Sequence, residues 1–369
     1  MKEKTLQKIS AAVFLGYIGV FSVASLLHEK HSFSENENRA LSVSPSFSLS
    51  SLVSGKFDES FETWFSDQFA FRDAWIETKA ALKKASLAIE NNDVYFGKDG
   101  KLIRRFAAYP PKTLDQNISA VNRFLNDNDL KGNVLLVPTA ADMDRNAKPG
   151  GAWDFDQSAL LDQIEKEMPD VNFIRIDDEL KQAENAYFRT DHHWNADGAY
   201  LGYAAICEEV LGKDPEKFTL TQVSDSFKGT MYSRSGAFWT EGEPIYRIEA
   251  DHPDPVRVTY DDTQETDSLY SEKRLNEKDQ YMYYLDGNHP LTRIDTDNGK
   301  GNTALVIKDS YAHILMPYLA REYEHIIMAD LRYWRSPASQ LVEDREHTDV
   351  YIIYSLDNFA QDPNPVLLR

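Results

Sequence analysis

The longest uninterrupted apolar stretch of the chain lies near its N-terminus. It extends from Ile9 to Leu27 without a charged residue, and charged residues return at Glu29. A run of this length is about what one helix needs to cross the hydrocarbon core of a bilayer. No polar face interrupts it, as one would in a buried helix of a globular domain. We therefore predict that residues 1–30 form an N-terminal transmembrane helix and its flanks.

The charges before this stretch predict its orientation. Lys2, Lys4 and Lys8 precede the apolar run, so the N-terminus is expected to stay in the cytoplasm while the main domain is extracytoplasmic. The alternative is a signal peptide that is cleaved, with the protein secreted. The small-x-small cleavage sites at 22–24 and 24–26 are weak, and the run is longer than a usual signal core. We favour a single-pass anchor in the cell membrane.

Two segments separate this anchor from the main pattern. Residues 31–56 are polar and rich in Ser, without a periodic pattern, and are expected to form a tether. From Phe57 to Ile89, apolar residues recur at helical spacing. Asp67 to Arg72 interrupts that spacing, and we predict a bend between two helices there.

From Val94 onward, short apolar runs alternate with amphipathic stretches. The strand-like runs are 94–96, 134–137, 173–176, 304–307, 326–328 and 350–354. The amphipathic stretches are 115–127, 157–167, 197–211, 312–323 and 337–345. This alternation is typical of an α/β fold with a parallel sheet and helices on both faces. Residues 57–369 are thus expected to form one α/β domain, with about 219–298 as an aromatic, Asp-rich insertion beside the site.

The segment Thr190 to Gly198 carries the first candidate chemistry. Asp191 precedes His193 by two positions, which places both side chains on one side of an extended segment. The carboxylate can then accept a hydrogen bond from the imidazole, fix its tautomer and stabilise the imidazolium. His192 points the other way, and we expect it to pack or to face the substrate.

The residues after the histidines are expected to start a helix. Trp194 is predicted to pack against that helix, with stacking on a sugar as the alternative, and Asn195 is its expected N-cap.

The candidate nucleophile follows the strand-like run 304–307. Chemistry in parallel sheets gathers at the carboxyl ends of strands, and Asp309-Ser310 occupies such a position. Ser310 is expected to attack an acyl carbonyl, with His193 as general base and Asp191 orienting it. The alternative is that Ser310 only caps a helix beginning near Ala312.

Composition limits the classes of substrate and of chemistry that the protein can have. The net charge of −20 argues against nucleic acid and anionic polymers, so a neutral or weakly charged substrate fits better. The single Cys207 excludes an intrachain disulfide and is expected to be a buried thiol. Asp191, His192 and His193 offer ligands for zinc, but adjacent histidines diverge and no second His/Cys cluster completes the shell. We expect neither a metal nor a cofactor.

Asp191-His192-His193-Trp194 matches the signature of the DHHW proteins, and further segments agree along nearly the whole chain. These are 37–41, 67–72, 95–100, 229–236, 287–290 and 308–311. The chain resembles this family, which is similar to the SGNH-hydrolase-like domains of the alginate O-acetylation proteins. The resemblance implies a flavodoxin-like SGNH fold, with Asp191, His193 and Ser310 as acid, base and nucleophile. It also implies that the protein transfers acetyl groups on exopolysaccharide, with these groups supplied by a multi-span membrane acyltransferase.

The sequence departs from ordinary SGNH hydrolases in two ways. Asp191 and His193 precede Ser310, an order that resembles a circular permutation and leaves a triad intact, because geometry defines it. Lys308 replaces the Gly of the Gly-Asp-Ser block. For the oxyanion, the candidate donors are the Ser310 amide and the side chain of Asn288, which is equally well explained as a turn residue.

Arg234, in the Ser-Arg-Ser-Gly block, is a further candidate for lining the cleft.

These observations favour a membrane-anchored, extracytoplasmic serine acyltransferase or esterase acting on O-acetyl groups of cell-surface polysaccharide. The sparing use of cysteine suggests a bacterial surface. The alternative is a non-catalytic module that binds glycan or a partner of the export and acetylation machinery. It would use the aromatic insertion around Trp239, Tyr246 and Tyr260.

Overall fold

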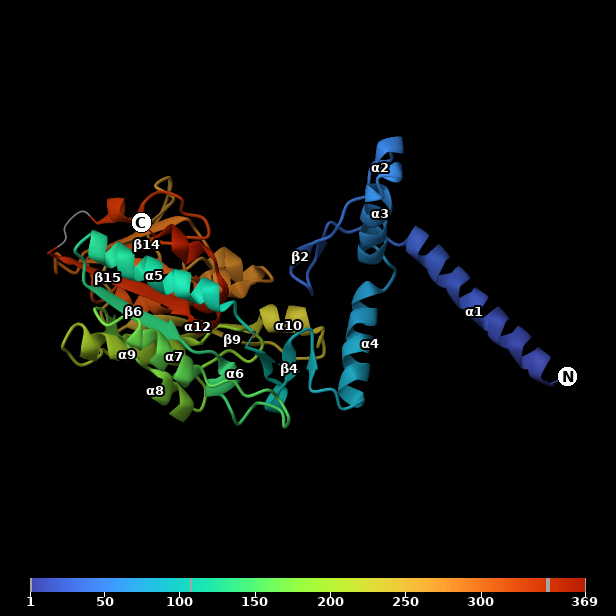
Figure 1. Ribbon diagram of the computed structural model, residues 1–369, viewed down its shortest axis with the longest axis horizontal. Coiled ribbons are helices and arrows are strands. Elements are labelled where there is room, and N and C mark those ends of the chain that lie inside the picture. Colours follow the sequence, from blue (N-terminus) through green and yellow to red (C-terminus); the bar gives the residue numbers. More distant parts are fainter. Residues whose placement is uncertain (1, 107, 343–345, 369) are drawn as a thin grey trace. The chain divides into compact units, whose positions relative to one another are not determined.

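The computed structural model describes the chain except residues 1, 107, 343–345 and 369 (Figure 1). Contacts divide it into two compact units, Met1–Ala88 with Gly236–Trp239, and Ile89–Ser235 with Thr240–Arg369. Residues 57–88, which the sequence pattern assigned to the α/β domain, thus cluster with the N-terminal segment.

The first unit begins with the apolar helix α1 (Lys2–Leu27). Within its part Lys4–Leu27, an 18-residue window has a mean hydropathy of 2.0 and is almost entirely exposed. By length and composition this helix can cross a membrane, and a signal sequence has the same properties.

The rest of the first unit is a short hairpin and three helices. They are β1 (Phe33–Ser34), β2 (Arg39–Ala40), α2 (Leu49–Val53), α3 (Lys56–Asp67) and α4 (Arg72–Ala85). The bend expected at residues 67–72 is confirmed, and Phe71 has a positive φ of 59° within it. Residues 31–56 carry the hairpin and α2, whereas the sequence predicted no regular structure there. Part of this structure depends on long-range contacts that a periodic pattern does not reveal: Arg39 and the Ser42 amide both bind the Asp67 carboxylate.

The second unit is built on an eight-stranded sheet with the order β11-β10-β12-β14-β13-β15-β6-β7. The strands are β6 (Gly132–Val137), β7 (Asn172–Phe173), β10 (Val256–Tyr260), β11 (Gln264–Thr266), β12 (Leu291–Thr296), β13 (Thr303–Lys308), β14 (His325–Ala329) and β15 (Thr348–Ser355). Strands β14, β13, β15, β6 and β7 pair in parallel, while β12, β10 and β11 pair antiparallel.

The predicted parallel sheet is thus confirmed as the five-stranded parallel part of a larger mixed sheet. Much of the predicted insertion extends the sheet: β10, β11 and β12 form its antiparallel edge. Burial explains why this edge was hard to recognise. Strand β13 is buried at nearly every position, whereas β10 alternates between buried and partly exposed residues. Such alternation is normal for antiparallel strands with one face toward solvent.

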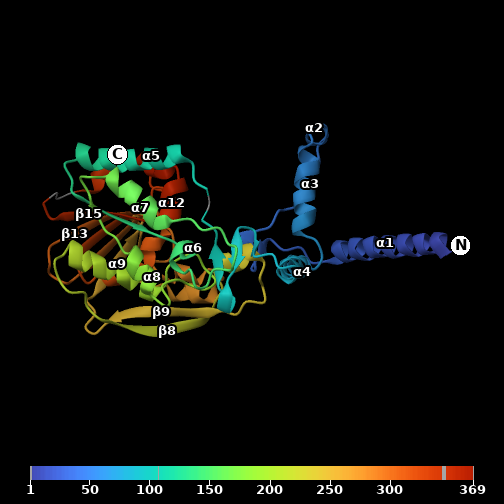
Figure 2. The ribbon, with the colours of Figure 1, turned by 60° about the horizontal axis from the view of Figure 1, so that its bottom comes forward.

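Helices cover both faces of the sheet, as predicted (Figure 2). The helices α5 (Pro111–Asp127), α7 (Gln157–Lys166) and α12 (Leu356–Gln361) share one apolar core with Val134, Leu305 and Ile352. On the opposite face, α9 (Ala196–Glu209), η4 (Ser310–Leu315) and α11 (Met316–Leu319) pack against Leu135 and Val306. Alternate residues of each strand thus enter different cores.

Two small sheets complete this unit. The run predicted at 94–96 is β4 (Val94–Phe96), but it pairs with β3 (Glu90–Asn91) and β5 (Leu102–Arg104) outside the central sheet. Strands β8 (Phe218–Phe227) and β9 (Glu243–Ala250) form a long ribbon along the lower edge of Figure 2.

The remaining elements are short helices. They are α6 (Ala140–Met143), α8 (Asp177–Gln182), α10 (Thr230–Ser235), η1 (Lys98–Gly100), η2 (Glu272–Asn276), η3 (Gln280–Tyr283), η5 (Ala338–Leu341) and η6 (Asn364–Leu367). Of the amphipathic stretch expected at 337–345, the described part contains only η5, and residues 343–345 lie outside the described residues.

Candidate active site

The Asp-His-His-Trp segment forms a tight turn that leads into α9. Its ends are held by the Phe188 amide, which donates to the His193 carbonyl at 3.2 Å, and by a bridge between Tyr187 and Trp194. Asn195 caps α9 by accepting a hydrogen bond from the Gly198 amide at 3.1 Å, as predicted. The turn therefore holds the side chains of Asp191, His192 and His193 in fixed positions just before α9.

The structure brings Asp191, His193 and Ser310 together in the order of a catalytic triad. His193 Nδ1 lies 2.5 Å from Asp191 Oδ1, and His193 Nε2 lies 2.8 Å from Ser310 Oγ. Ser310 directly follows β13 and Asp309, at the carboxyl end of the parallel strands. With Nδ1–H toward the carboxylate, Nε2 is free to accept the serine proton.

The second oxygen of Asp191 is held by a residue that the sequence did not single out. Thr230, at the start of α10, donates to Asp191 Oδ2 from its amide at 2.7 Å and from its hydroxyl at 2.8 Å. Burial alone would raise the pKa of the Asp191 carboxyl. The interactions with His192 and His193 outweigh burial and hold that pKa well below its usual value.

The His193 imidazole is neutral at physiological pH. Burial, together with the neighbouring His192, lowers the pKa of His193 to about 4, although Asp191 acts in the opposite direction. A neutral ring at this position can take a proton from Ser310, so the protonation state suits a general base.

Tyr281 contacts both His193 and Ser310, and sequence reasoning missed it. Its ring, from η3, stacks on the His193 ring with centroids 3.8 Å apart and planes 8° apart. Its hydroxyl donates to the Ser310 carbonyl at 2.9 Å. The only sequence signal was an aromatic run at 281–284, which does not distinguish this ring from its buried neighbours.

The backbone around the nucleophile is fixed by Asp309. This carboxylate accepts from the Tyr311 amide at 2.9 Å, and from the amide and hydroxyl of Ser355 at 3.0 Å. Because Ser355 ends β15, one side chain fixes the ends of two neighbouring strands. Ser310 thus stands on a rigid strand end, as catalytic groups require.

Lys308, which stands in place of the usual Gly, belongs to a buried charged network. Its Nζ lies 2.7 Å from His313 Nε2 and 3.1 Å from Asp330 Oδ2. Arg332 also binds Asp330, and it donates to Asn288 Oδ1 at 2.9 Å. Asn288 is therefore tied to this network by its oxygen, and its role as an oxyanion donor stays a prediction.

Two other predicted site residues are engaged elsewhere. Arg234 binds the turn between β3 and β4, through the Asn92 carbonyl and the Asp93 carboxylate, each at 2.8 Å. Trp194 is fully buried and donates to the Tyr311 carbonyl at 2.8 Å. Packing, the favoured role of Trp194, thus agrees with the geometry, whereas stacking on a sugar does not.

His192 remains accessible beside the triad. Its Nδ1 lies 2.7 Å from Thr230 Oγ1, and its side chain is 26% exposed. With Arg104, Arg105 and Tyr311 it lines a narrow cleft. Asp191 also lines this cleft, whereas Ser310 does not.

The same segment contains the one group of possible metal ligands among the described residues. Ligand atoms of Asp191, His192 and His193 lie within 4.8 Å of one another. Both nitrogens of His193 already face Asp191 and Ser310. A metal ion would have to displace one of these partners and would still lack a fourth protein ligand, so the residues fit zinc poorly.

Comparison with known proteins agrees with this fold. Residues 95–277 match the model of the SGNH hydrolase-like domain of the acetyltransferase AlgX. No curated protein matches the sequence. A DHHW family protein from Eubacterium siraeum has a similar structure, with a TM-score of 0.66 and 20% identity, covering 76% of this chain and 96% of that one. Bacillus cereus PatB1 with a sulfonyl adduct has a TM-score of 0.61 and 23% identity, covering 76% and 99%.

The chain therefore carries an SGNH hydrolase-like domain. The resemblance to the DHHW proteins and to the domains of alginate O-acetylation proteins is confirmed at the level of this domain. The matched region ends before Ser310, so the assignment of that serine rests on its geometry.

The neutral His193 ring beside Ser310 predicts an acid limb in the pH–rate profile of serine labelling. Only the neutral ring can accept the serine proton, so we expect the rate of fluorophosphonate labelling of the full chain in detergent to be level near pH 7. It should fall at lower pH, with a midpoint near 4. Burial and Asp191 raise the pKa of Asp279 to about 6, so the Asp279→Asn variant serves as a control that must keep this limb. A midpoint of 6.5 or higher would contradict the prediction.

Tyr281 provides a test of ring stacking against hydrogen bonding. Tyr281→Phe keeps the stack and loses one hydrogen bond, so labelling should slow by about tenfold or less. Tyr281→Leu also removes the aromatic face, and we expect a further loss of about tenfold. Tyr284→Phe removes a neighbouring buried hydroxyl that donates to Tyr246, and it should leave the rate unchanged. Equal rates for the Phe and Leu variants would show that stacking is unimportant.

Gly229 tests the position of the Asp191 carboxylate. A Cβ at Gly229 would lie 2.3 Å from Asp191 Cβ, so Gly229→Ala must displace Asp191. We expect labelling at Ser310 to slow by about tenfold or more, because the orienting hydrogen bond is lost. Gly150→Ala, where a Cβ meets open space, is the matched control. The far-ultraviolet circular dichroism of both variants should match that of the wild type, and an unchanged rate in Gly229→Ala would refute the argument.

Proposed function

We propose that this protein is a membrane-anchored, extracytoplasmic serine acyltransferase or esterase that acts on O-acetyl groups of cell-surface polysaccharide. The observation that carries the proposal is the position of His193, hydrogen-bonded on one side to Asp191 and on the other to Ser310. An SGNH hydrolase-like domain of the AlgX kind supports acyl chemistry at this place.

In the first half-reaction, Ser310 Oγ attacks the acetyl carbonyl of a donor ester and passes its proton to His193 Nε2. Asp191 stabilises the imidazolium, and the stacked Tyr281 face adds a cation–π contribution. The tetrahedral intermediate collapses as His193 returns the proton to the leaving alcohol oxygen. An acetyl-serine remains.

In the second half-reaction, His193 takes a proton from an acceptor hydroxyl, whose oxygen attacks the acetyl-serine carbonyl. Collapse transfers the acetyl group to the acceptor, and the proton returns to Ser310. A sugar hydroxyl as acceptor gives acetyl transfer, whereas water gives ester hydrolysis. The Ser310 amide at the start of η4 is our candidate donor to the oxyanion, with Asn288 as the second candidate.

Features outside the triad support the proposed membrane anchoring and the proposed class of substrate. Helix α1 has the length and composition of a membrane anchor. The net charge of −20 favours a neutral polysaccharide over an anionic one and argues against nucleic acid. Acetyl groups would then come from a partner such as a multi-span membrane acyltransferase. No step of this chemistry uses a metal or a cofactor.

Labelling with a serine-reactive fluorophosphonate tests the nucleophile. We expect the full chain in detergent to be labelled, and Ser310→Ala and His193→Ala to lose labelling by at least about a hundredfold. Ser86→Ala removes an exposed serine at the end of α4 and is the matched control. Mass spectrometry of the labelled peptide should locate the adduct on Ser310. Full labelling of folded Ser310→Ala would overturn the proposal.

A further inference from the structure

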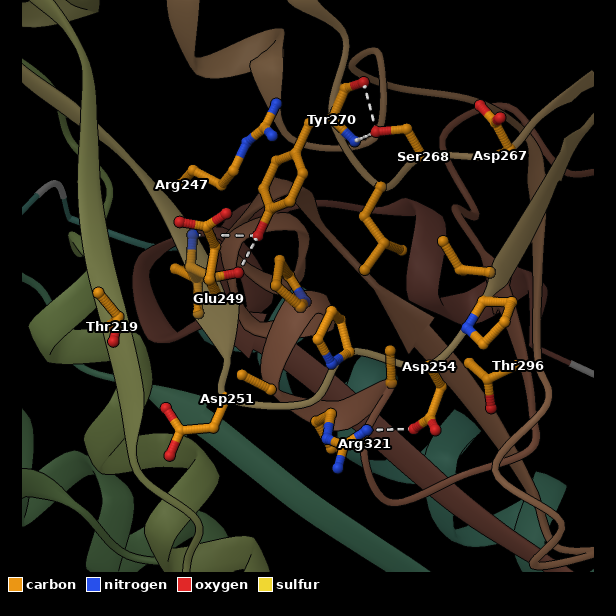
Figure 3. A pocket seen from close by; sticks show the side chains of 18 residues that line it. Thr219, Arg247, Glu249, Asp251, Asp254, Asp267, Ser268, Tyr270, Thr296 and Arg321 are labelled. Carbon is orange, nitrogen blue, oxygen red and sulfur yellow. Dashed lines mark hydrogen bonds and ion pairs between the residues drawn. The ribbon is translucent and has the colours of Figure 1, made fainter.

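A second site lies in the part of the domain that also builds the antiparallel edge of the sheet. A cavity of about 620 Å³ is bounded by β8, β9, β10, the end of β12 and α11 (Figure 3). This volume falls within the range of small-molecule sites, which is about 300–1,000 Å³. The triad does not use this cavity, and none of its lining residues belongs to the candidate active site.

The cavity and Ser310 lie near opposite ends of the parallel strands. Thr296 lines the cavity, and its amide donates to the Glu324 carbonyl at 2.8 Å, just before β14 begins. Ser310 follows the other end of β13, which runs parallel to β14. The six residues of β13 span about 20 Å. A polymer must therefore span at least about 20 Å to contact both sites at once.

The lining combines apolar and polar surface. Pro253, Pro255, Pro317 and Leu269 contribute apolar area without exposed hydrogen-bonding side chains. In Figure 3 the labelled polar side chains approach from several sides, with Arg247 and Tyr270 on one side and Asp251 and Arg321 on another. Apolar surface among well-placed polar groups suits a ligand that has both C–H faces and hydroxyls.

Several of the polar groups are already fixed in place. The Tyr270 hydroxyl donates to the Ile248 carbonyl at 2.6 Å and accepts from the Ile248 amide at 3.1 Å. Arg247 donates to the Tyr283 hydroxyl at 2.9 Å, and Arg321 binds Glu216 and Asp254. A wall held in this way loses little conformational freedom when a ligand binds.

The charges exclude several ligand classes. Four carboxylates line the cavity against two guanidinium groups, so phosphate esters and uronates are disfavoured. Asp251 and Asp267 make no hydrogen bond or ion pair with any described residue, and each can accept from a ligand. The cavity carboxylates are too dispersed to form one of the possible metal-binding groups in the described part of the chain. A polyamine donates hydrogen bonds only and would leave the guanidinium groups unmatched.

We propose that this cavity binds a neutral oligosaccharide segment. Sugar hydroxyls donate to Asp251 and Asp267 and accept from Arg321, while the C–H faces of the rings pack on the prolines. The biological role of this cavity rests on the proposed function, because the cavity would hold the polysaccharide whose acetyl groups are processed at Ser310. Binding itself does not require the triad.

The test is binding of defined hexasaccharides to the full chain in detergent, measured by isothermal titration calorimetry. The neutral probes are cellohexaose, chitohexaose and mannohexaose, and the comparison ligands are hexagalacturonate, spermine and calcium. We expect at least one neutral hexasaccharide to bind. Asp251→Asn/Asp267→Asn should weaken that binding by about tenfold or more, which corresponds to about 1.4 kcal/mol. Asp170→Asn/Asp214→Asn removes two exposed carboxylates outside the cavity and should change nothing.

A steric variant and a catalytic variant separate the possible outcomes. Thr219→Trp places a large ring at the cavity wall and should abolish binding, whereas Gln222→Trp on the same strand should not. Ser310→Ala should bind like the wild type. Cavity-dependent binding by a chain that fluorophosphonate does not label would sustain this inference and refute the proposed function. No binding of any neutral hexasaccharide, equal binding by Thr219→Trp, or a preference for spermine or calcium would overturn the inference.

Discussion

The site depends on how the Asp191 carboxylate is held. Its Oδ1 faces the ring and the amide of His193, and its Oδ2 receives both donors of Thr230. A buried carboxylate is stable as an anion only when such donors replace water. Because the partners come from two segments, the turn before α9 and the start of α10 must pack correctly before His193 acquires its orientation. The backbone that carries the nucleophile is then linked to the base through Tyr281.

A second constraint is the carboxyl edge of the parallel strands. Asp309 ties the end of β13 to Ser355 at the end of β15, while Lys308 reaches Asp330 beyond the end of β14. The nucleophile thus stands where three neighbouring strands end and are joined by side chains. Joined strand ends of this kind are rigid. Variation in sequence and conformation is then expected in the exposed loops around them.

Much of the site was predictable because its central signal is local. Asp191 and His193 are two residues apart, so their proximity follows from the geometry of an extended segment, and Ser310 follows a recognisable buried strand. Thr230 and Tyr281 could not be found in this way, because only the tertiary fold brings them to the triad. Arg234 was assigned to the cleft from its motif, yet Asp93, 141 positions away, binds it. The antiparallel strands were missed as part of the sheet because their burial alternates.

The fourth residue of the Asp-His-His-Trp motif has a role that is separate from the chemistry. The Trp194 indole occupies space that Gly202 leaves free in α9, where a Cβ would approach its ring to 2.8 Å. The motif is thus also a folding element that joins a turn to a helix. Loss of Ser310 would remove the nucleophile but leave this packing of Trp194 against α9 in place. Genome surveys that count enzymes by this motif alone would then include inactive descendants, and the strand-end serine is the residue that separates the two populations.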